Sequence, residues 1–89
     1  MVSNPAGGYA RASMPPSRQD LLNRFGEAIR QERKRQGISQ EQLALLAEID
    51  RGYMGNVERG EENISLASIL KVTEVLKVKP SVLLDRAGY

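Results

Sequence analysis

Few side chains in this sequence could take part in catalysis or hold a metal ion. The 89 residues include no His and no Cys, which excludes imidazole acid–base chemistry, thiol chemistry, disulfides and zinc sites built from these residues. The carboxylates Glu58, Glu61 and Glu62 lie close together, but no base, nucleophile or phosphate-cradling loop accompanies them. A charged loop is the ordinary explanation of such a cluster. An enzyme is therefore the weakest interpretation, and no cofactor and no metal is expected.

Positive charge is concentrated in one part of the chain. The sequence has 13 Lys and Arg against 11 Asp and Glu, and the net charge of +2 does not by itself indicate a polyanionic partner. Four of the six residues 30–35 are basic: Arg30, Arg33, Lys34 and Arg35. Such a run usually forms a solvated helix face, which Glu27 and Glu32 here partly neutralise.

The N-terminal part differs in composition from the rest. The first twenty residues hold three of the four prolines and the Gly7–Gly8 pair, but no Leu, Ile or Phe, so they have little to bury on folding. We expect residues 1–17 to form a flexible arm. An alternative is that Arg11 and Arg18 let this arm follow a nucleic-acid backbone or minor groove. No apolar run approaches the roughly 18 residues of a membrane span, and a soluble, cytoplasmic protein without membrane contact is expected.

Apolar residues at helical spacing predict five helices and no strand in residues 18–89. The first helix carries the stripe Leu22, Phe25 and Ile29 and ends near Gly37. The second, residues 40–47, begins with Ser39 and Gln42 in a capping-box pattern.

Three further helices follow in the sequence. The third, residues 51–59, has Asp50 as its N-cap. The fifth begins at Pro80, which suits the first position of a helix. The fourth follows Ser65 and has this apolar stripe: Leu66, Ile69, Leu70, Thr73 and Leu76. The pattern indicates a single all-α domain.

The second and third predicted helices have the form of a helix-turn-helix. Both are about eight residues long, and three residues join them: Glu48, Ile49 and Asp50. In this motif the second helix can enter a major groove about 12 Å wide, while the N-terminus of the first points at phosphate.

The same region resembles a known family. It contains the run ISQEQLALLAEIDRGYMGNVERGEENISL, preceded by ERKRQG and followed by VLKVKPSVLL. This resembles the Cro and phage-repressor (XRE-like) helix-turn-helix family, closest in character to the small controller proteins of restriction-modification systems. The resemblance covers about residues 22–85 and implies a compact five-helix domain like that of the lambda repressor. The arm lies outside it.

The resemblance implies roles for individual residues. Gln40 matches a residue that bonds a DNA phosphate, and Tyr53 one that contacts the backbone or packs on a base step. Arg33 and Glu58 match a buried ion pair. Base-reading positions fall at Arg51, Gly52 and Asn56, and the predicted DNA-binding set is completed by Arg59 and Asn63.

The chemistry of two side chains agrees with these roles. Arg is a bidentate donor to guanine O6 and N7, and Asn pairs with adenine N6 and N7, as expected here for Arg51 and Asn56. Solvated side chains at both positions, and half-buried packing of Tyr53, remain alternatives.

The sequence departs from the family pattern at several positions. Glu48 stands where the family usually has Gly, so the turn either tolerates a left-handed residue or changes shape. Gly52 offers only close backbone approach, and Glu61 with Glu62 should repel phosphate. The neighbouring Leu45 and Leu46 are either extra core or an exposed contact patch.

The sequence therefore predicts a DNA-binding transcription regulator that reads a palindromic operator as a homodimer, with half-sites about 34 Å apart. Two dimers on one DNA are a further option. The predicted dimer surface comprises Val78, Val82, Leu83 and Leu84, although these residues could instead close the core. An antitoxin or adaptor that uses the same fold to hold a partner protein is the alternative function.

Overall fold

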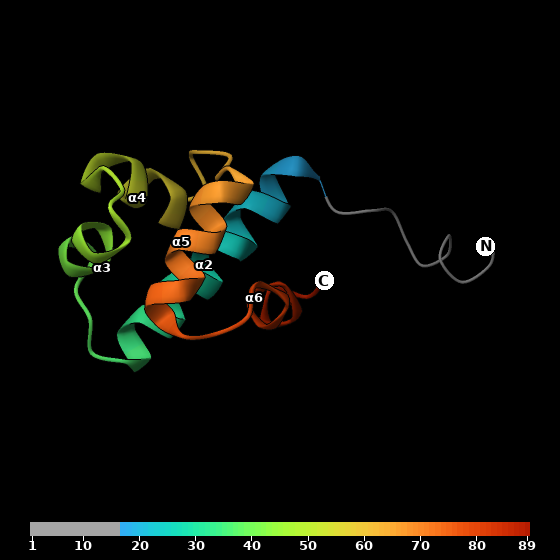
Figure 1. Ribbon diagram of the computed structural model, residues 1–89. Coiled ribbons are helices and arrows are strands. Elements are labelled where there is room, and N and C mark those ends of the chain that lie inside the picture. Colours follow the sequence, from blue (N-terminus) through green and yellow to red (C-terminus); the bar gives the residue numbers. More distant parts are fainter. Residues whose placement is uncertain (1–16) are drawn as a thin grey trace, which may run out of the picture.

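The computed structural model describes residues 17–89, which fold into five α-helices (Figure 1). The helices are α2 (Arg18–Arg35), α3 (Gln40–Ala47), α4 (Arg51–Glu58), α5 (Leu66–Leu76) and α6 (Pro80–Arg86). Residues 17–89 contain no strand, so the predicted all-α architecture is confirmed. All of the predicted arm except Ser17 lies outside the described residues.

The helices begin at the residues that the capping patterns predict. The side chains of Ser17, Ser39, Asp50 and Ser65 each accept a hydrogen bond from a backbone N–H in the first turn that follows. Ser39 also forms the predicted reciprocal capping box with Gln42. The predicted third helix was one residue too long at its end, because α4 ends at Glu58 and residue 59 is its C-cap.

The turn between α3 and α4 keeps its shape without a glycine. Glu48 adopts the left-handed conformation, with φ 57° and ψ 46°. Its N–H donates to Leu45 O, and the N–H of Ile49 donates to Ala44 O, so the last carbonyls of α3 are satisfied. Of the two alternatives left by the sequence, the structure therefore shows a left-handed non-glycine residue, which is a strained conformation for a residue with a Cβ.

The core lies where α2, α3, α4 and α5 meet, and α6 closes it from one side. The largest fully buried apolar side chains come from all five helices: Ile29, Leu43, Met54, Val57, Val72, Leu76 and Leu83. The predicted stripe of α5 is wrong at two positions, since Leu66 is 72% exposed and Leu70 is 54% exposed. The buried residues of α5 are Val72, Thr73 and Leu76, so the prediction was correct for Thr73 and Leu76 and did not include Val72. Helix α5 packs mainly against α3.

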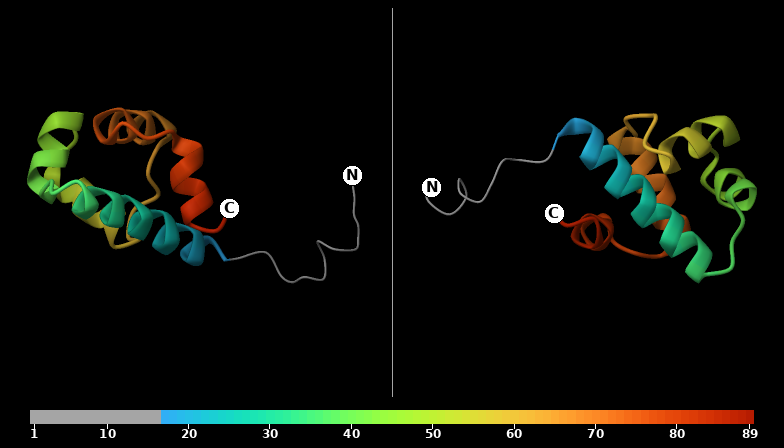
Figure 2. Two further views of the ribbon diagram at one scale, coloured as in Figure 1. Left: turned by 90° about the horizontal axis from the view of Figure 1, so that it is seen from below. Right: turned by 180° about the vertical axis from the view of Figure 1, so that it is seen from behind.

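Figure 2 shows α3 and α4 together at one end of the folded part, with α6 toward the other end. The crossing of α2 with α4 depends on Gly26, which is buried in the middle of α2. A Cβ on this residue would lie 2.2 Å from Val57 O and 2.9 Å from Glu58 O. The two helix backbones therefore touch, and only glycine fits this position.

A buried carboxylate fastens α6 to the end of α2. The side chain of Glu32 is fully buried and accepts hydrogen bonds from Arg35, Gln36 and Arg86. Gln36 also donates to Leu76 O at 2.8 Å, which adds the end of α5 to the cluster. The hydrogen bond from Arg35 is the main cause that lowers the pKa of Glu32 to about 2, against the opposing effect of burial. This role was not predicted, because Glu32 lies in a charged run that is typical of a solvated helix face.

Candidate nucleic-acid interface

The first turn of α4 presents the residues that were predicted to read bases. Arg51 and Gly52 are exposed at the start of the helix, and Asn56 is half-buried one turn later. The side chain of Asp50 caps the helix by accepting from Tyr53 N at 3.0 Å. Within residues 17–89, Arg51 forms no ion pair with a carboxylate. Its guanidinium therefore keeps all its donors for another molecule.

The predicted ion pair between Arg33 and Glu58 is present and bidentate. Arg33 Nε donates to Glu58 Oε2 at 2.8 Å, and Arg33 Nη2 donates to Glu58 Oε1 at 2.9 Å. Arg33 Nη1 also donates to Ile38 O at 3.0 Å. The carboxylate raises the pKa of Arg33, because it stabilises the charged guanidinium. The pair joins α2, the loop before α3 and the end of α4, and so fixes the angle at which α4 is presented.

Gln40, the first residue of α3, belongs to the same polar cluster. Its Nε2 donates to Glu58 Oε1 at 3.0 Å, an interaction that the sequence did not predict. The N-terminus of α3 is thereby tied to the C-terminal end of α4. A phosphate contact by Gln40 would have to use the rest of its amide or its backbone N–H.

Tyr53 connects α4 with the start of α5. Its hydroxyl oxygen accepts a hydrogen bond from Ser65 N at 3.1 Å, and its ring is half-buried against the core. The structure thus shows the packing role that was left open for this residue. The hydroxyl hydrogen remains available as a donor to another group.

Arg59 and Asn63, the last two residues of the predicted DNA-binding set, follow α4. Arg59 donates to Asn56 Oδ1 at 2.6 Å and to Glu61 Oε1 at 3.2 Å. Asn63 is exposed in the loop between α4 and α5. Arg59 is therefore in contact with a predicted base-reading residue, and Asn63 lies apart from that cluster in the chain.

The predicted dimer surface needs one correction. Leu83 is fully buried within the single chain, so it closes the core and offers no surface to a second copy. Val78 and Val82 are half-buried, and Leu84 is 38% exposed. The exposed Leu66 and Leu70 were missed, because the helical period of α5 made them look like core.

The pair Leu45 and Leu46 is exposed, with relative accessibilities of 75% and 62%. The interpretation as extra core is therefore wrong. Hollows lie on both sides of this pair, one bordered by Gly37, Ile38 and Gln42 and the other by residues of α5.

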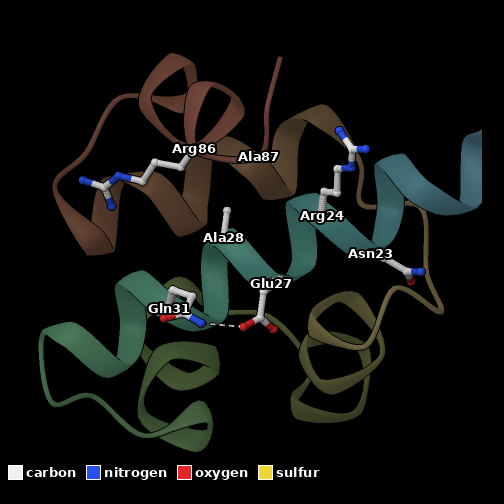
Figure 3. A pocket seen from close by; sticks show the side chains of 7 residues that line it. All are labelled: Asn23, Arg24, Glu27, Ala28, Gln31, Arg86 and Ala87. Atoms are coloured by element: carbon white, nitrogen blue, oxygen red, sulfur yellow. Dashed lines mark hydrogen bonds between the residues drawn. The ribbon is translucent and has the colours of Figure 1, made fainter. Parts of the chain in front are cut away.

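A separate groove lies between α2 and α6 (Figure 3). Ala28 and Ala87 are among the residues that line it, together with Arg24 and Glu27 of α2. Glu27 accepts a hydrogen bond from Gln31 within this groove. None of the predicted DNA-binding residues lines it, so the groove and the exposed part of α4 are distinct parts of the surface.

Helices α3 and α4 have the geometry of a helix-turn-helix, and an exposed Arg stands at the start of α4. The ion pair between Arg33 and Glu58 fixes the angle of α4. Together these features define a DNA-binding regulator. The helix-turn-helix family model matches residues 29–83. The chain therefore belongs to this helix-turn-helix family. Between residues 17 and 89, no helix is long and apolar enough to cross a membrane.

The chain is similar to several control proteins. It is 42% identical over 62 residues to control protein C.BamHI of Bacillus amyloliquefaciens, covering 68% of this chain and 76% of that protein. It is 35% identical over 69 residues to control protein C.SmaI of Serratia marcescens, covering 78% and 82%. The crystal structure of the restriction-modification controller protein C.AhdI from Aeromonas hydrophila matches with 47% identity and a TM-score of 0.68, covering 70% and 94%. These relatives do not favour the adaptor or antitoxin alternative.

Proposed function

We propose that this protein is the controller of a restriction-modification system, a transcription regulator that binds a palindromic operator as a homodimer. The observation that carries the proposal is the first turn of α4, where Arg51 is exposed and free of intramolecular ion pairs in the described part of the chain. Similarity to proteins named as control proteins supports the biological setting. Because the ligand is DNA, the proposal places the protein in the cytoplasm.

The proposed contacts follow from the side-chain chemistry. Arg51 donates two hydrogen bonds to guanine O6 and N7 in the major groove. Gly52 lets the helix backbone approach the base edges closely, since it has no side chain. Gln40 and the N-terminus of α3 face a phosphate, while Tyr53 and Asn63 provide further contacts at the edge of the interface.

The proposed homodimer has a surface that differs from the sequence-based one. Leu66 and Leu70 lie one turn apart on α5 and expose a large part of their side chains. Burying such leucines is favourable by roughly 1.5–3 kcal/mol per side chain. We place the dimer contact on these two residues together with Leu84 and the exposed edges of Val78 and Val82.

Footprinting of the purified protein on the DNA upstream of its own gene tests the proposal. We expect a protected region with two-fold symmetry, whose half-sites are separated by about one helical turn. Loss of one specific bidentate contact in Arg51→Ala should weaken binding by about 1–3 kcal/mol and relax the preference at one base pair. Lys71→Ala removes an exposed positive charge from α5 and is the matched control, which should keep the base preference. A footprint that Arg51→Ala leaves unchanged would show that α4 is not the recognition helix.

A further inference from the structure

Three side chains at the end of α4 form a chain of hydrogen bonds that fixes the orientation of Asn56. Arg59 Nη2 donates to Asn56 Oδ1 at 2.6 Å, and Arg59 Nε donates to Glu61 Oε1 at 3.2 Å. A guanidinium can only donate, so the atom of Asn56 that faces it must be the amide oxygen. The amide NH₂ of Asn56 therefore points away from Arg59.

This orientation makes the surface around Asn56 rich in donors. Asn56 offers the two N–H groups of its amide, and the Arg59 side chain, which is 57% exposed, keeps further N–H groups. Asn normally reads adenine by accepting from N6 and donating to N7. Here a cationic donor lies beside the oxygen that would accept from N6. An adenine amino group would have to share this oxygen with Arg59 and would face the guanidinium N–H groups, whereas guanine offers acceptors at both N7 and O6.

We propose that Asn56 and Arg59 read one base pair as a unit and select guanine over adenine, with Glu61 as a positioning residue. The inference rests on the proposed DNA-binding function and revises the assignment of Asn56 to adenine. Glu61 engages Nε of Arg59, which keeps Nη2 at Asn56 and restrains the guanidinium from turning to a phosphate.

The surroundings of Arg59 support this positioning. Arg59 Nη1 and Gln40 Oε1 each lie 3.1 Å from the place that a Cβ on Gly55 would occupy. The guanidinium is thus packed over the α4 backbone on one side and held by Glu61 on the other. The cluster around Glu58, which includes Gln40, extends in this way to the base-reading unit.

The experiment begins with selection of binding sites by the full chain from a library of randomised duplexes. The position that loses its preference in Asn56→Ala is the one that Asn56 reads, and we expect guanine there. Replacing this guanine by 7-deazaguanine, which lacks the N7 acceptor, should weaken binding as much as adenine does.

Variants of Arg59 and Glu61 then test whether these residues determine how Asn56 reads the base pair. In Arg59→Ala, Asn56 is free to pair with adenine, and the guanine-to-adenine affinity ratio should fall at least about fivefold, the low end for one base contact. Glu61→Gln should lower the guanine-to-adenine affinity ratio by a smaller factor than Arg59→Ala does. It should also strengthen binding to every duplex, since one negative charge is lost. The matched control is Glu62→Gln, because Glu62 forms no ion pair with Arg59 in the described residues. This control should also strengthen binding, but leave the ratio unchanged.

Four outcomes would overturn the inference. Adenine at the position read by Asn56 would contradict the inference, and so would an unchanged guanine-to-adenine affinity ratio in Arg59→Ala. Neither result would contradict specific DNA binding by Arg51. An equal loss of the ratio in Glu61→Gln and Glu62→Gln would show a general charge effect in place of positioning. A wild-type chain that selects no sequence from the library would overturn the proposed function as well.

Discussion

Removing the guanidinium in Arg33→Met should destabilise the domain strongly, because it leaves the Glu58 carboxylate buried without a cation. The side chain of Glu58 is 2% exposed and accepts two hydrogen bonds from Arg33 at 2.8 and 2.9 Å. Within residues 17–89, Gln40 would remain as its side-chain partner, at 3.0 Å. Breaking one side of a buried ion pair costs about 3–5 kcal/mol. The total stability of a domain is about 0.05–0.15 kcal/mol per residue, so for a chain this short the variant should be close to unfolding.

The double variant Arg33→Met/Glu58→Leu separates loss of the ion pair from the burial of a lone charge. It contains no charged group at this site, and replacing both partners of a buried pair by apolar groups can be nearly neutral. We expect urea denaturation, followed by circular dichroism, to show the double variant more stable than Arg33→Met alone. Both variants should bind DNA more weakly than the wild type, because the ion pair that joins α2 to α4 is gone. A single variant that loses less than about 1 kcal/mol, the typical net value of one hydrogen bond, would refute the bracing role of the pair.

Three more changes test the packing of the domain. The lowered pKa of Glu32 should contribute at most about 3 kcal/mol to the free energy of unfolding above pH 4.5. This contribution should be lost as the pH falls through about 2. When the free energy of unfolding is measured as a function of pH, Glu32→Gln should not show this loss. Gly26→Ala places a methyl group 2.2 Å from Val57 O and should cost at least about 1–3 kcal/mol in urea denaturation. In the control Gly52→Ala, at an exposed position of α4, the methyl group meets the side chain of Asp50 at 3.1 Å. This side chain can shift, so the control should change the free energy of unfolding by no more than about 1 kcal/mol. Glu48→Gly relieves the left-handed strain and should raise the melting temperature by about 4–8 °C for each kcal/mol gained; a lower melting temperature would show that Glu48 contributes contacts of its own.

The starts of the helices could be predicted from local signals. Ser39, Asp50 and Pro80 mark helix starts through interactions within one turn, which depend only on neighbouring residues. The face of α5 could not be predicted in this way. Leu66 and Leu70 share the helical period of the core residues, but burial depends on which face of α5 packs against α3 and α6, which is a tertiary property.

Other features depended on contacts between distant residues. Glu32 has the same local pattern as an exposed acid in a charged run, and only the approach of α6, through Arg86, makes it a buried anchor. Gly26 did carry a usable signal, because an isolated glycine inside a helical pattern often marks close helix packing. The resemblance to a family predicted the pair of Arg33 and Glu58, which local spacing alone would not have found.

The polar contacts from α2 to the end of α4 connect stability with base reading. Glu58 accepts hydrogen bonds from Arg33 and Gln40. Gln40 and Arg59 both pack beside Gly55, at the place that a Cβ would occupy, and Arg59 also donates to Asn56. A methyl group on Gly55 must displace one of two flexible side chains that it would approach to 3.1 Å. We therefore expect Gly55→Ala to change base preference more than stability. Displacement of Arg59 frees Asn56, while the buried bonds between Arg33 and Glu58 remain intact. Site selection and urea denaturation on this variant measure the two effects separately, and a large loss of stability with an unchanged base preference would place Gly55 in the core cluster alone.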